Sequence, residues 1–433
     1  MNNIIKILLI FIFINGCSLH KNSKFWTNEK IKEEMSATIS EMFVQEKPSS
    51  LEFNPNLKIS LYTKPINKSF FKNFDNNNGR TNYSGELENI SKFKFSKIDN
   101  FNDYDPRLSF ENDNIIFFDN KGSILKFNNN SKLVWKKNYY TKTEKNQKPI
   151  LFFANNGQTL IVTDNIAKYY AINIDNGKLL WSKNNTAPFN SQIKIYKDKF
   201  FAIDFQNILR AYSMKNGEEI WNIKTENSLV RTQKKLSMVI VNNKIYFNNS
   251  LGDISSVDIN SGELLWQIPT QNTLVYDESF FLKTSDIIAN DNSLYLSNNK
   301  NQFFSIDIKT GTFNWMQKIN SNLRSTIVDS YIFNISLEGY LFIIAKNTGN
   351  IIRTTDIFKN FKSKKRKNIQ PTGFILGIND IYVTTNNGRL LVIEIATGAI
   401  KSIIKIDNDK ISRPSVLNEN LYIVKNNSVI KLN

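Results

Sequence analysis

The stretch that decides the fold is Ser256-Val-Asp-Ile-Asn-Ser-Gly262-Glu-Leu-Leu-Trp266. An apolar strand leads into a polar corner, a glycine closes the corner, and a tryptophan follows four residues later. The same order returns in residues 171–181, 211–221 and 305–315. A fixed offset between a corner glycine and a large aromatic residue, kept through four copies, indicates an array of repeated structural units.

Weaker copies extend this array in both directions. The corner positions are Ser131, Gly177, Gly217, Gly262, Gly311, Gly349 and Gly398. Their spacings are 46, 40, 45, 49, 38 and 49 residues, which is the length of a four-stranded propeller blade. In the last two copies Arg353 and Ser402 stand where the tryptophan would be.

The corner glycine and the tryptophan have predictable roles in such a blade. A glycine suits the positive φ that ends the corner. We expect acidic side chains such as Asp175, Asp258 and Asp307 to cap these turns. A single sheet cannot bury both of its faces, so the indoles should pack on the neighbouring blade. The residues predicted to dock one blade on the next are Trp135, Trp181, Trp221, Trp266 and Trp315.

The corners predict an all-β, eight-bladed β-propeller of four-stranded antiparallel blades. Seven corners give seven blades, and the strand pair in residues 420–432 begins another without an outer strand. An open sheet edge would promote aggregation, so this last blade needs a donor. Residues 91–98 alternate like a strand and lack a partner, and we expect them to close the eighth blade. Seven blades is the alternative.

The first residues form a targeting signal. An apolar run from Ile4 to Ile14 is too short to span a bilayer, and it ends at Ile14-Asn-Gly-Cys17. This resembles a bacterial lipobox, which implies cleavage after residue 16 and lipidation of Cys17. Ser18 follows, and by analogy this favours the outer membrane, at its periplasmic face. We therefore divide the chain into a signal peptide (1–16), a lipidated tether with a possible short helix (17–60) and the propeller (61–433).

Composition argues against nucleic acid as a partner and against several kinds of catalysis. The net charge is +17, but Lys and Arg are spread over blade edges and turns. One basic run, residues 359–367, is either a solvated loop or a contact for an anionic partner. The chain has one His, His20, and one Cys, Cys17, so no His/Cys metal site and no His-based catalytic triad can be built. We expect no enzyme activity and no cofactor. The sequence does not exclude a paired-carboxylate site whose two acidic residues come from different blades.

The corner motif, Ala-x-[Asn/Asp]-x-x-x-Gly-x-x-x-Trp, resembles the repeat of pyrroloquinoline-quinone-type propellers. That repeat occurs in quinoprotein alcohol dehydrogenases and in the BamB family, lipoproteins of the outer-membrane β-barrel assembly machinery. The lipobox, the blade count and the stretch from Phe74 to Gly85 resemble the BamB family. The dehydrogenases usually carry a vicinal disulfide, which a single cysteine cannot form.

The resemblance to the BamB family implies a partner and contact residues. The partner would be the barrel-forming subunit, a BamA-like protein bound through a POTRA domain, with this chain a monomer within the hetero-complex. The implied contacts are Leu229, Arg231 and Asp286, although Ile288 replaces the second aspartate of the family pattern. Arg231 and Asp286 could instead pair with each other. The alternative functions are a periplasmic quinone-dependent dehydrogenase and a propeller that binds polysaccharide or peptide.

Overall fold

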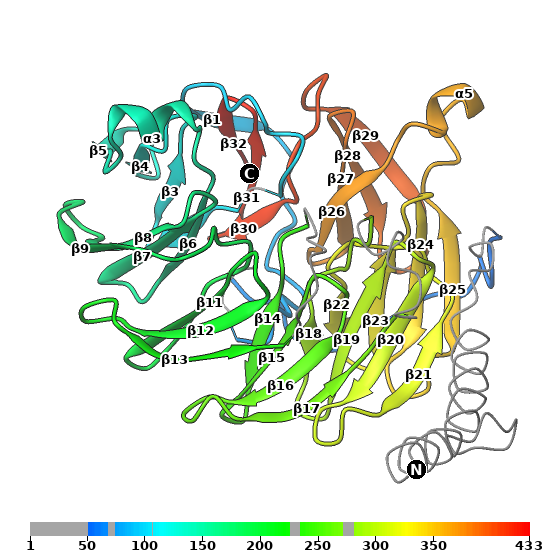
Figure 1. Cartoon of the computed structure of the whole chain (residues 1–433). Coiled ribbons are helices and arrows are strands. Elements are labelled where there is room, and N and C mark those ends of the chain that lie inside the picture. Colours follow the sequence, from blue (N-terminus) through cyan, green and yellow to red (C-terminus); the bar gives the residue numbers. More distant parts are fainter. Residues whose placement is uncertain (1–50, 68–73, 106, 226–233, 272–280) are drawn as a thin grey trace, which may run out of the picture. The chain divides into compact units, whose positions relative to one another are not determined.

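The computed structural model describes residues 51–67, 74–105, 107–225, 234–271 and 281–433. Its strands form eight four-stranded antiparallel sheets that follow one another around a ring (Figure 1). All of them lie in the compact unit made of Glu46–Thr270 and Tyr276–Asn433. The eight-bladed propeller is therefore confirmed, and the seven-bladed alternative is wrong.

The blades are numbered in chain order, and each is given from its inner to its outer strand. Blade one contains β2 (Ser109–Glu111), β3 (Asn114–Phe118), β4 (Ile124–Phe127) and β5 (Leu133–Lys137). Blade two contains β6 (Leu151–Asn155), β7 (Thr159–Asp164), β8 (Lys168–Asn173) and β9 (Leu179–Asn184). Blade three contains β10 (Lys194–Tyr196), β11 (Lys199–Ile203), β12 (Ile208–Ser213) and β13 (Glu219–Lys224). Blade four contains β14 (Met238–Val241), β15 (Lys244–Asn248), β16 (Ile254–Asp258) and β17 (Leu264–Ile268).

The second half of the ring repeats this order. Blade five contains β18 (Ile288–Ala289), β19 (Ser293–Asn298), β20 (Gln302–Asp307) and β21 (Phe313–Gln317). Blade six contains β22 (Thr326–Val328), β23 (Tyr331–Ile335), β24 (Tyr340–Ala345) and β25 (Ile351–Asp356). Blade seven contains β26 (Pro371–Leu376), β27 (Asp380–Thr385), β28 (Arg389–Glu394) and β29 (Ile400–Lys405). Blade eight contains β30 (Ser415–Leu417), β31 (Asn420–Lys425), β32 (Ser428–Leu432) and β1 (Asn89–Lys94).

The eighth blade closes as the sequence predicts. Its outer strand is β1, which pairs antiparallel with β32 and sets Phe93 opposite Val429 (Figure 1). The strand is shorter than the predicted 91–98, but Ile98 still donates its backbone N–H to Asn426 O at 2.7 Å. Pairing with β1 covers the edge of β32 that would otherwise be open where the two ends of the ring meet.

Burial follows the position of a strand within its blade. In the middle strands both faces are covered; β8, for example, is buried from Tyr169 to Ile172. In the outer strand β9 the pattern alternates between exposed and half-buried residues. The core therefore lies between neighbouring blades, as expected when stacked sheets bury each other's faces.

The corner turns are capped four residues before the glycine. Asp258 Oδ1 accepts from the backbone N–H groups of Asn260 at 2.9 Å and Ser261 at 3.0 Å, and Asp307 repeats this arrangement. The prediction for Asp175 is wrong. The cap in that blade is Asn173, whose Oδ1 accepts from the N–H of Asp175 at 3.0 Å. Asp175 stands two residues too late to reach these N–H groups.

The tryptophans lie on the corners of the following blades. Trp135 donates its Nε1–H to Ile174 O at 3.2 Å, Trp181 donates to Met214 O at 3.0 Å, and Trp315 donates to Lys346 O at 3.1 Å. Each acceptor is the residue three places before the corner glycine. Trp221 and Trp266 lie against Gly262 and Gly311 in the same way, but their Nε1–H groups find no hydrogen-bond acceptor among the residues that the structure describes.

Arg353 takes the place of the tryptophan in blade six. It is fully buried, and its Nη2 donates to Ile395 O at 2.9 Å, three residues before Gly398. A guanidinium therefore supplies the donor that an indole supplies elsewhere. Nη1 also donates to Leu57 O at 2.9 Å, which ties the chain segment before the ring to this blade.

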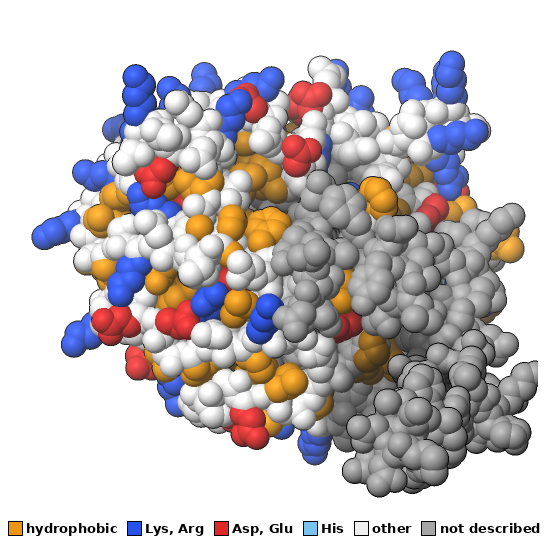
Figure 2. Space-filling view, in the orientation of Figure 1, with side chains coloured by type: hydrophobic (Ala, Val, Ile, Leu, Met, Phe, Trp, Pro, Cys, Tyr) orange, Lys and Arg blue, Asp and Glu red, His pale blue; other side chains and the backbone are white. Residues whose placement is uncertain are grey.

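Short segments outside the blades complete the described chain. Residues 51–67 run along blades six and seven, where Ile59 is buried and donates its N–H to Ala396 O at 2.9 Å. The described residues include two short helices, α3 (Lys142–Asn146) and α5 (Ser363–Arg366). The basic run lies at α5, where Arg366 pairs with Asp356 at 2.6 Å. Figure 2 shows Lys and Arg side chains along the upper and left edges of the drawn face.

Candidate binding site at the centre of the ring

The segment from Phe74 to Tyr83 crosses the inner strands of several blades. Ile240 in β14 donates its N–H to Phe74 O at 3.0 Å, and Ala289 in β18 donates to Asp75 O at 3.0 Å. Further along, the N–H of Thr81 donates to Leu376 O in β26 at 2.8 Å. The inner ends of blades four, five and seven are thus held by one stretch of chain.

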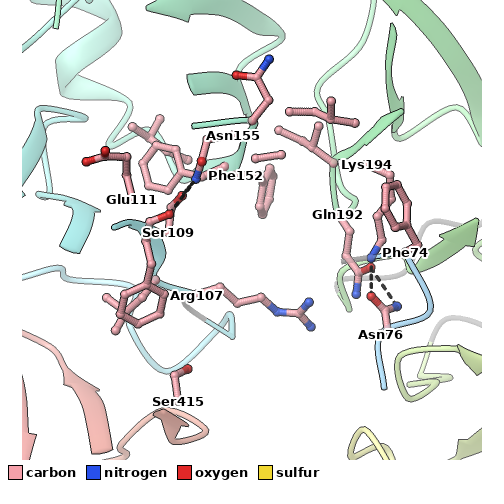
Figure 3. Close-up of a pocket in the computed structure, with 18 of the residues that line it drawn as sticks. Phe74, Asn76, Arg107, Ser109, Glu111, Phe152, Asn155, Gln192, Lys194 and Ser415 are labelled. Carbon is pink, nitrogen blue, oxygen red and sulfur yellow. Dashed lines mark hydrogen bonds between the residues drawn. The ribbon is translucent and has the colours of Figure 1, made fainter. Parts of the chain in front are cut away.

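Asn76 is the most connected side chain of this segment. It is 3% exposed. Its Nδ2 donates to Ile287 O at 2.8 Å and to Gln192 Oε1 at 3.1 Å, and its Oδ1 accepts from Lys194 Nζ at 2.5 Å (Figure 3). One amide therefore connects groups at the inner edges of blades three and five.

A cavity of about 590 Å³ opens beside this segment (Figure 3). Its walls come from the inner strands of blades one, two and three and from the residues just before the inner strands of blades four, six and eight. The polar and charged residues that line it include Asn76, Asp105, Arg107, Glu111, Gln192, Lys194, Lys235, Arg324 and Arg413. Its aromatic walls include Phe74, Tyr104, Phe110 and Phe152. A volume of this size lies in the range typical of small-molecule sites.

The charges around the cavity are mostly positive. Arg107 forms an ion pair with Asp286, and Arg324 Nε lies 3.9 Å from the same carboxylate. Glu111 pairs with Lys126 at 2.9 Å instead of with a cavity cation. Six of the charged residues that line the cavity are basic and two are acidic.

The confined charges shift the pKa values of these groups. Burial lowers the pKa of Lys194 to about 7, and the neighbouring Arg324 and Arg107 add to this. Burial and Arg107 likewise lower the pKa of Lys235 to about 7. Burial tends to raise the pKa of Asp286, but Arg107 and Arg324 outweigh it, and the net pKa lies well below the usual range. These directions follow from charges held close together away from water.

The residues predicted to bind a partner are only partly covered by the structure. Leu229 and Arg231 lie outside the described residues, as does Cys17. Asp286 is 5% exposed and is held by Arg107. Its carboxylate therefore belongs to the charged groups at the inner end of blade five.

Sequence reasoning missed the cavity cations. Arg107, Lys194, Lys235, Arg324 and Arg413 come from five different blades and share no spacing along the chain. The available signal was the stretch from Phe74 to Gly85, which stood out from the repeat and proves to run past the inner strands. Closure of the ring brings these residues together, and no local sequence pattern indicates that they are close in space.

The cavity does not suit the calcium or lanthanide ion of a quinoprotein. Within the described ranges, no three His, Cys, Asp or Glu side chains come close enough to hold a metal ion. Such hard cations need several oxygen ligands, usually carboxylates, and here lysines and arginines dominate.

The fold and its centre define a class of protein: an eight-bladed propeller of glycine-corner and tryptophan-strand repeats, with a polar segment and a cation-rich cavity on the inside. The family described as outer membrane protein assembly factor BamB matches residues 97–355, more than half of the chain. The chain belongs to this family, as the resemblance of the corner motif implies. This membership is consistent with a periplasmic location at the outer membrane.

Solved structures share the fold at low sequence identity. BamB from Moraxella catarrhalis is 15% identical, with a TM-score of 0.62 over 80% of this chain and 97% of that one. Quinohemoprotein alcohol dehydrogenase from Comamonas testosteroni is 10% identical, with a TM-score of 0.63 over 82% and 78% of the two chains. Sqt1 from Saccharomyces cerevisiae is 10% identical, with a TM-score of 0.59 over 82% and 99%. Such likenesses establish the fold and carry no function.

Two further comparisons complete the description. No curated protein sequence matches the chain significantly. Among the described residues, no helix has the length and apolar character needed to cross a bilayer.

Proposed function

We propose that this chain is a non-catalytic scaffold of the outer-membrane β-barrel assembly machinery. It is anchored through lipidated Cys17 at the periplasmic face of the outer membrane, and it binds a BamA-like barrel-forming subunit through a POTRA domain. The observation that carries the proposal is the family match over residues 97–355. A ring of sheets suits this role because it holds loops rigidly and limits the ordering cost of binding.

The topology supports a single contact rim. Leu229 and Arg231 belong to the connection between β13 and β14, and Asp286 belongs to the connection between β17 and β18. Both connections join the outer strand of one blade to the inner strand of the next. In this proposal Leu229 and Arg231 contact the partner, and the buried Asp286 supports the rim through its ion pair with Arg107.

The proposal is tested by capture from membranes. The full-length tagged chain is cross-linked in cells, solubilised in detergent and purified, and the bound proteins are identified by mass spectrometry. We expect a barrel-forming subunit with POTRA domains among them. Its absence from the cross-linked material would overturn the proposal.

Variants separate direct contacts from support. Arg231→Ala and Leu229→Ala should each weaken capture about tenfold or more, as expected for interface hot spots. Neither should change the melting temperature. Asp286→Asn should lower the melting temperature, because it removes the buried carboxylate that pairs with Arg107 and leaves only Asp105, at 3.7 Å, to offset this cation. Lys364→Ala on α5 removes one exposed charge and serves as the control, with capture unchanged.

A further inference from the structure

The donors around the cavity outnumber the acceptors that the described residues offer them. Gln192 is 6% exposed and uses its Oε1 to accept from Asn76, but its Nε2 has no hydrogen-bond partner among the described residues. Arg413 donates its Nε–H to Phe374 O at 2.9 Å, while its Nη1 and Nη2 are buried with no acceptor in the part of the chain that the structure describes. Buried donors are satisfied in nearly all folded proteins, so unmatched donors at one cavity point to an acceptor supplied from outside.

The cations point to the same conclusion. Lys235 Nζ lies 5.5 Å from the centre of the Phe152 ring and has no hydrogen-bond acceptor within the described part of the chain. Arg324 faces a carboxylate that already pairs with Arg107. The lowered pKa values of Lys194 and Lys235 show that positive charge is held there at a cost. An anion in the cavity would offset that cost by Coulomb attraction in a poorly solvated setting.

We propose that this cavity binds a small organic anion whose carboxylate or phosphate oxygens accept from Arg324, Arg413 and Gln192. Guanidinium groups bind both oxyanions through paired N–H donors, which explains the choice of chemistry. The rings of Phe74, Phe110 and Phe152 form an apolar wall for the carbon skeleton of the ligand. This site is independent of the proposed scaffold function.

Figure 3 shows how the donors are arranged. Arg107 extends into the open space from one side, and Gln192 and Lys194 lie across it, beside Asn76. They belong to segments that precede or form the inner strands of blades one and three. Because the ring fixes the separation of these strands, the donors are preorganised and a ligand meets a low ordering cost.

The test is isothermal titration calorimetry on the purified full chain at pH 7 and fixed ionic strength. Citrate is the carboxylate probe, inorganic phosphate is the phosphate probe, and glycerol is the neutral probe. We expect saturable one-to-one binding of citrate or phosphate and none of glycerol. Preference for one of the two anions identifies the chemical group. Failure of both anions to bind saturably would overturn the proposal.

Two cavity variants and one matched control test whether the anion binds in this cavity. Arg413→Gln should weaken anion binding about tenfold, as expected when a hydrogen bond to a charged group is lost. Lys235→Met should weaken it by a similar factor, because it removes a cation from the cavity. Lys364→Met removes the same charge from the exposed surface of α5 and should leave binding unchanged. Melting temperatures identify any variant that fails to fold. If one cavity variant fails, the other one tests whether the anion binds in the cavity. Equal losses in the cavity variants and the control would show non-specific charge attraction and reject the site.

Discussion

At the scale of single residues, the fold depends on a glycine that lies under a tryptophan ring. Gly311 has a φ of +75°, and a Cβ on it would lie 2.8 Å from ring atoms of Trp266. Two separate constraints therefore select glycine: the backbone conformation and the space. Each repeat supplies a glycine for the preceding blade and a tryptophan for the following one, so both recur in the four complete copies and their spacing within a repeat is visible in the sequence.

Gly311→Ala should destabilise the ring by about 2–4 kcal/mol, the sum of the cost of a positive φ and of the steric overlap. Urea denaturation followed by tryptophan fluorescence measures the loss. Gly157→Ala is the matched control, because Gly157 has a φ of +91° but nothing within 4 Å of its Cβ position. That variant should lose only about 1–2 kcal/mol. Equal losses in the two variants would contradict the role of the indole.

A second residue-scale prediction concerns the buried Lys194. Its pKa is lowered to about 7 by burial, with Arg324 and Arg107 contributing, whereas a lysine in the unfolded chain titrates near 10.4. Between these values the unfolded chain binds a proton that the folded chain does not. Stability should therefore rise with pH from about 7 to about 10.

Lys194→Met should flatten this rise, since it removes one of the titrating groups, while Lys235 keeps part of the effect. Melting temperatures recorded from pH 6 to pH 10 make the comparison. The exposed Lys364→Met is expected to keep the wild-type slope. A variant slope identical to that of the wild type would show that Lys194 does not titrate in this window.

At the scale of strands and blades, the features that could be predicted are those that the local sequence determines. Corner glycine, cap and tryptophan lie within eleven residues of one another, so their pattern repeats visibly in each copy. The closing strand was predictable because a sheet edge near the C-terminus needed a partner. The cap at Asn173 was not, because Asp175 offered a second polar side chain in the same corner and only the turn geometry distinguishes them.

The closing strand β1 should be essential for the ring. Phe93 is fully buried, and its ring centre lies 5.7 Å from that of Phe127 in blade one. Phe93 therefore holds β1 against the rest of blade eight and also packs against the neighbouring blade one. Phe93→Ala should cost about 3–5 kcal/mol and accelerate hydrogen exchange in β31 and β32.

Lys92→Ala, on the exposed face of the same strand, is the control for this prediction. It should change stability by no more than about 0.5 kcal/mol, because surface substitutions away from special contacts have small effects. If Phe93→Ala left exchange in β31 and β32 unchanged, β1 would be a peripheral addition and not the closure of the ring.

At the scale of the whole molecule, the arrangement of residues at the centre of the ring could not be predicted from the sequence. The cavity cations come from five blades, and their proximity depends on the blade count and on the closure together. Adding or removing one blade would separate Arg107 from Asp286, which belong to blades one and five on opposite sides of the ring. The binding chemistry of the centre is thus a property of the closed ring and not of any repeat.

The segment from Phe74 to Tyr83 is the element that makes this centre rigid, and Asn76 is the side chain on which we expect it to depend. Asn76→Ala removes donors to Ile287 O and Gln192 Oε1 and the acceptor of Lys194. The loss should be about 2–4 kcal/mol, because several buried partners become unsatisfied at once.

Hydrogen exchange with mass spectrometry distinguishes a central role for Asn76 from a local one. Exchange should increase in β10, β14 and β18, whose flanking groups bond to this segment, and should stay unchanged in β27 and β31 on other blades. Asn78→Ala is the matched control, since Asn78 is equally buried but makes no side-chain hydrogen bond with the described residues. Because that variant leaves the central bonds in place, its exchange pattern should follow the wild type. An increase limited to residues next to position 76 would mean that the blades hold their positions without this segment.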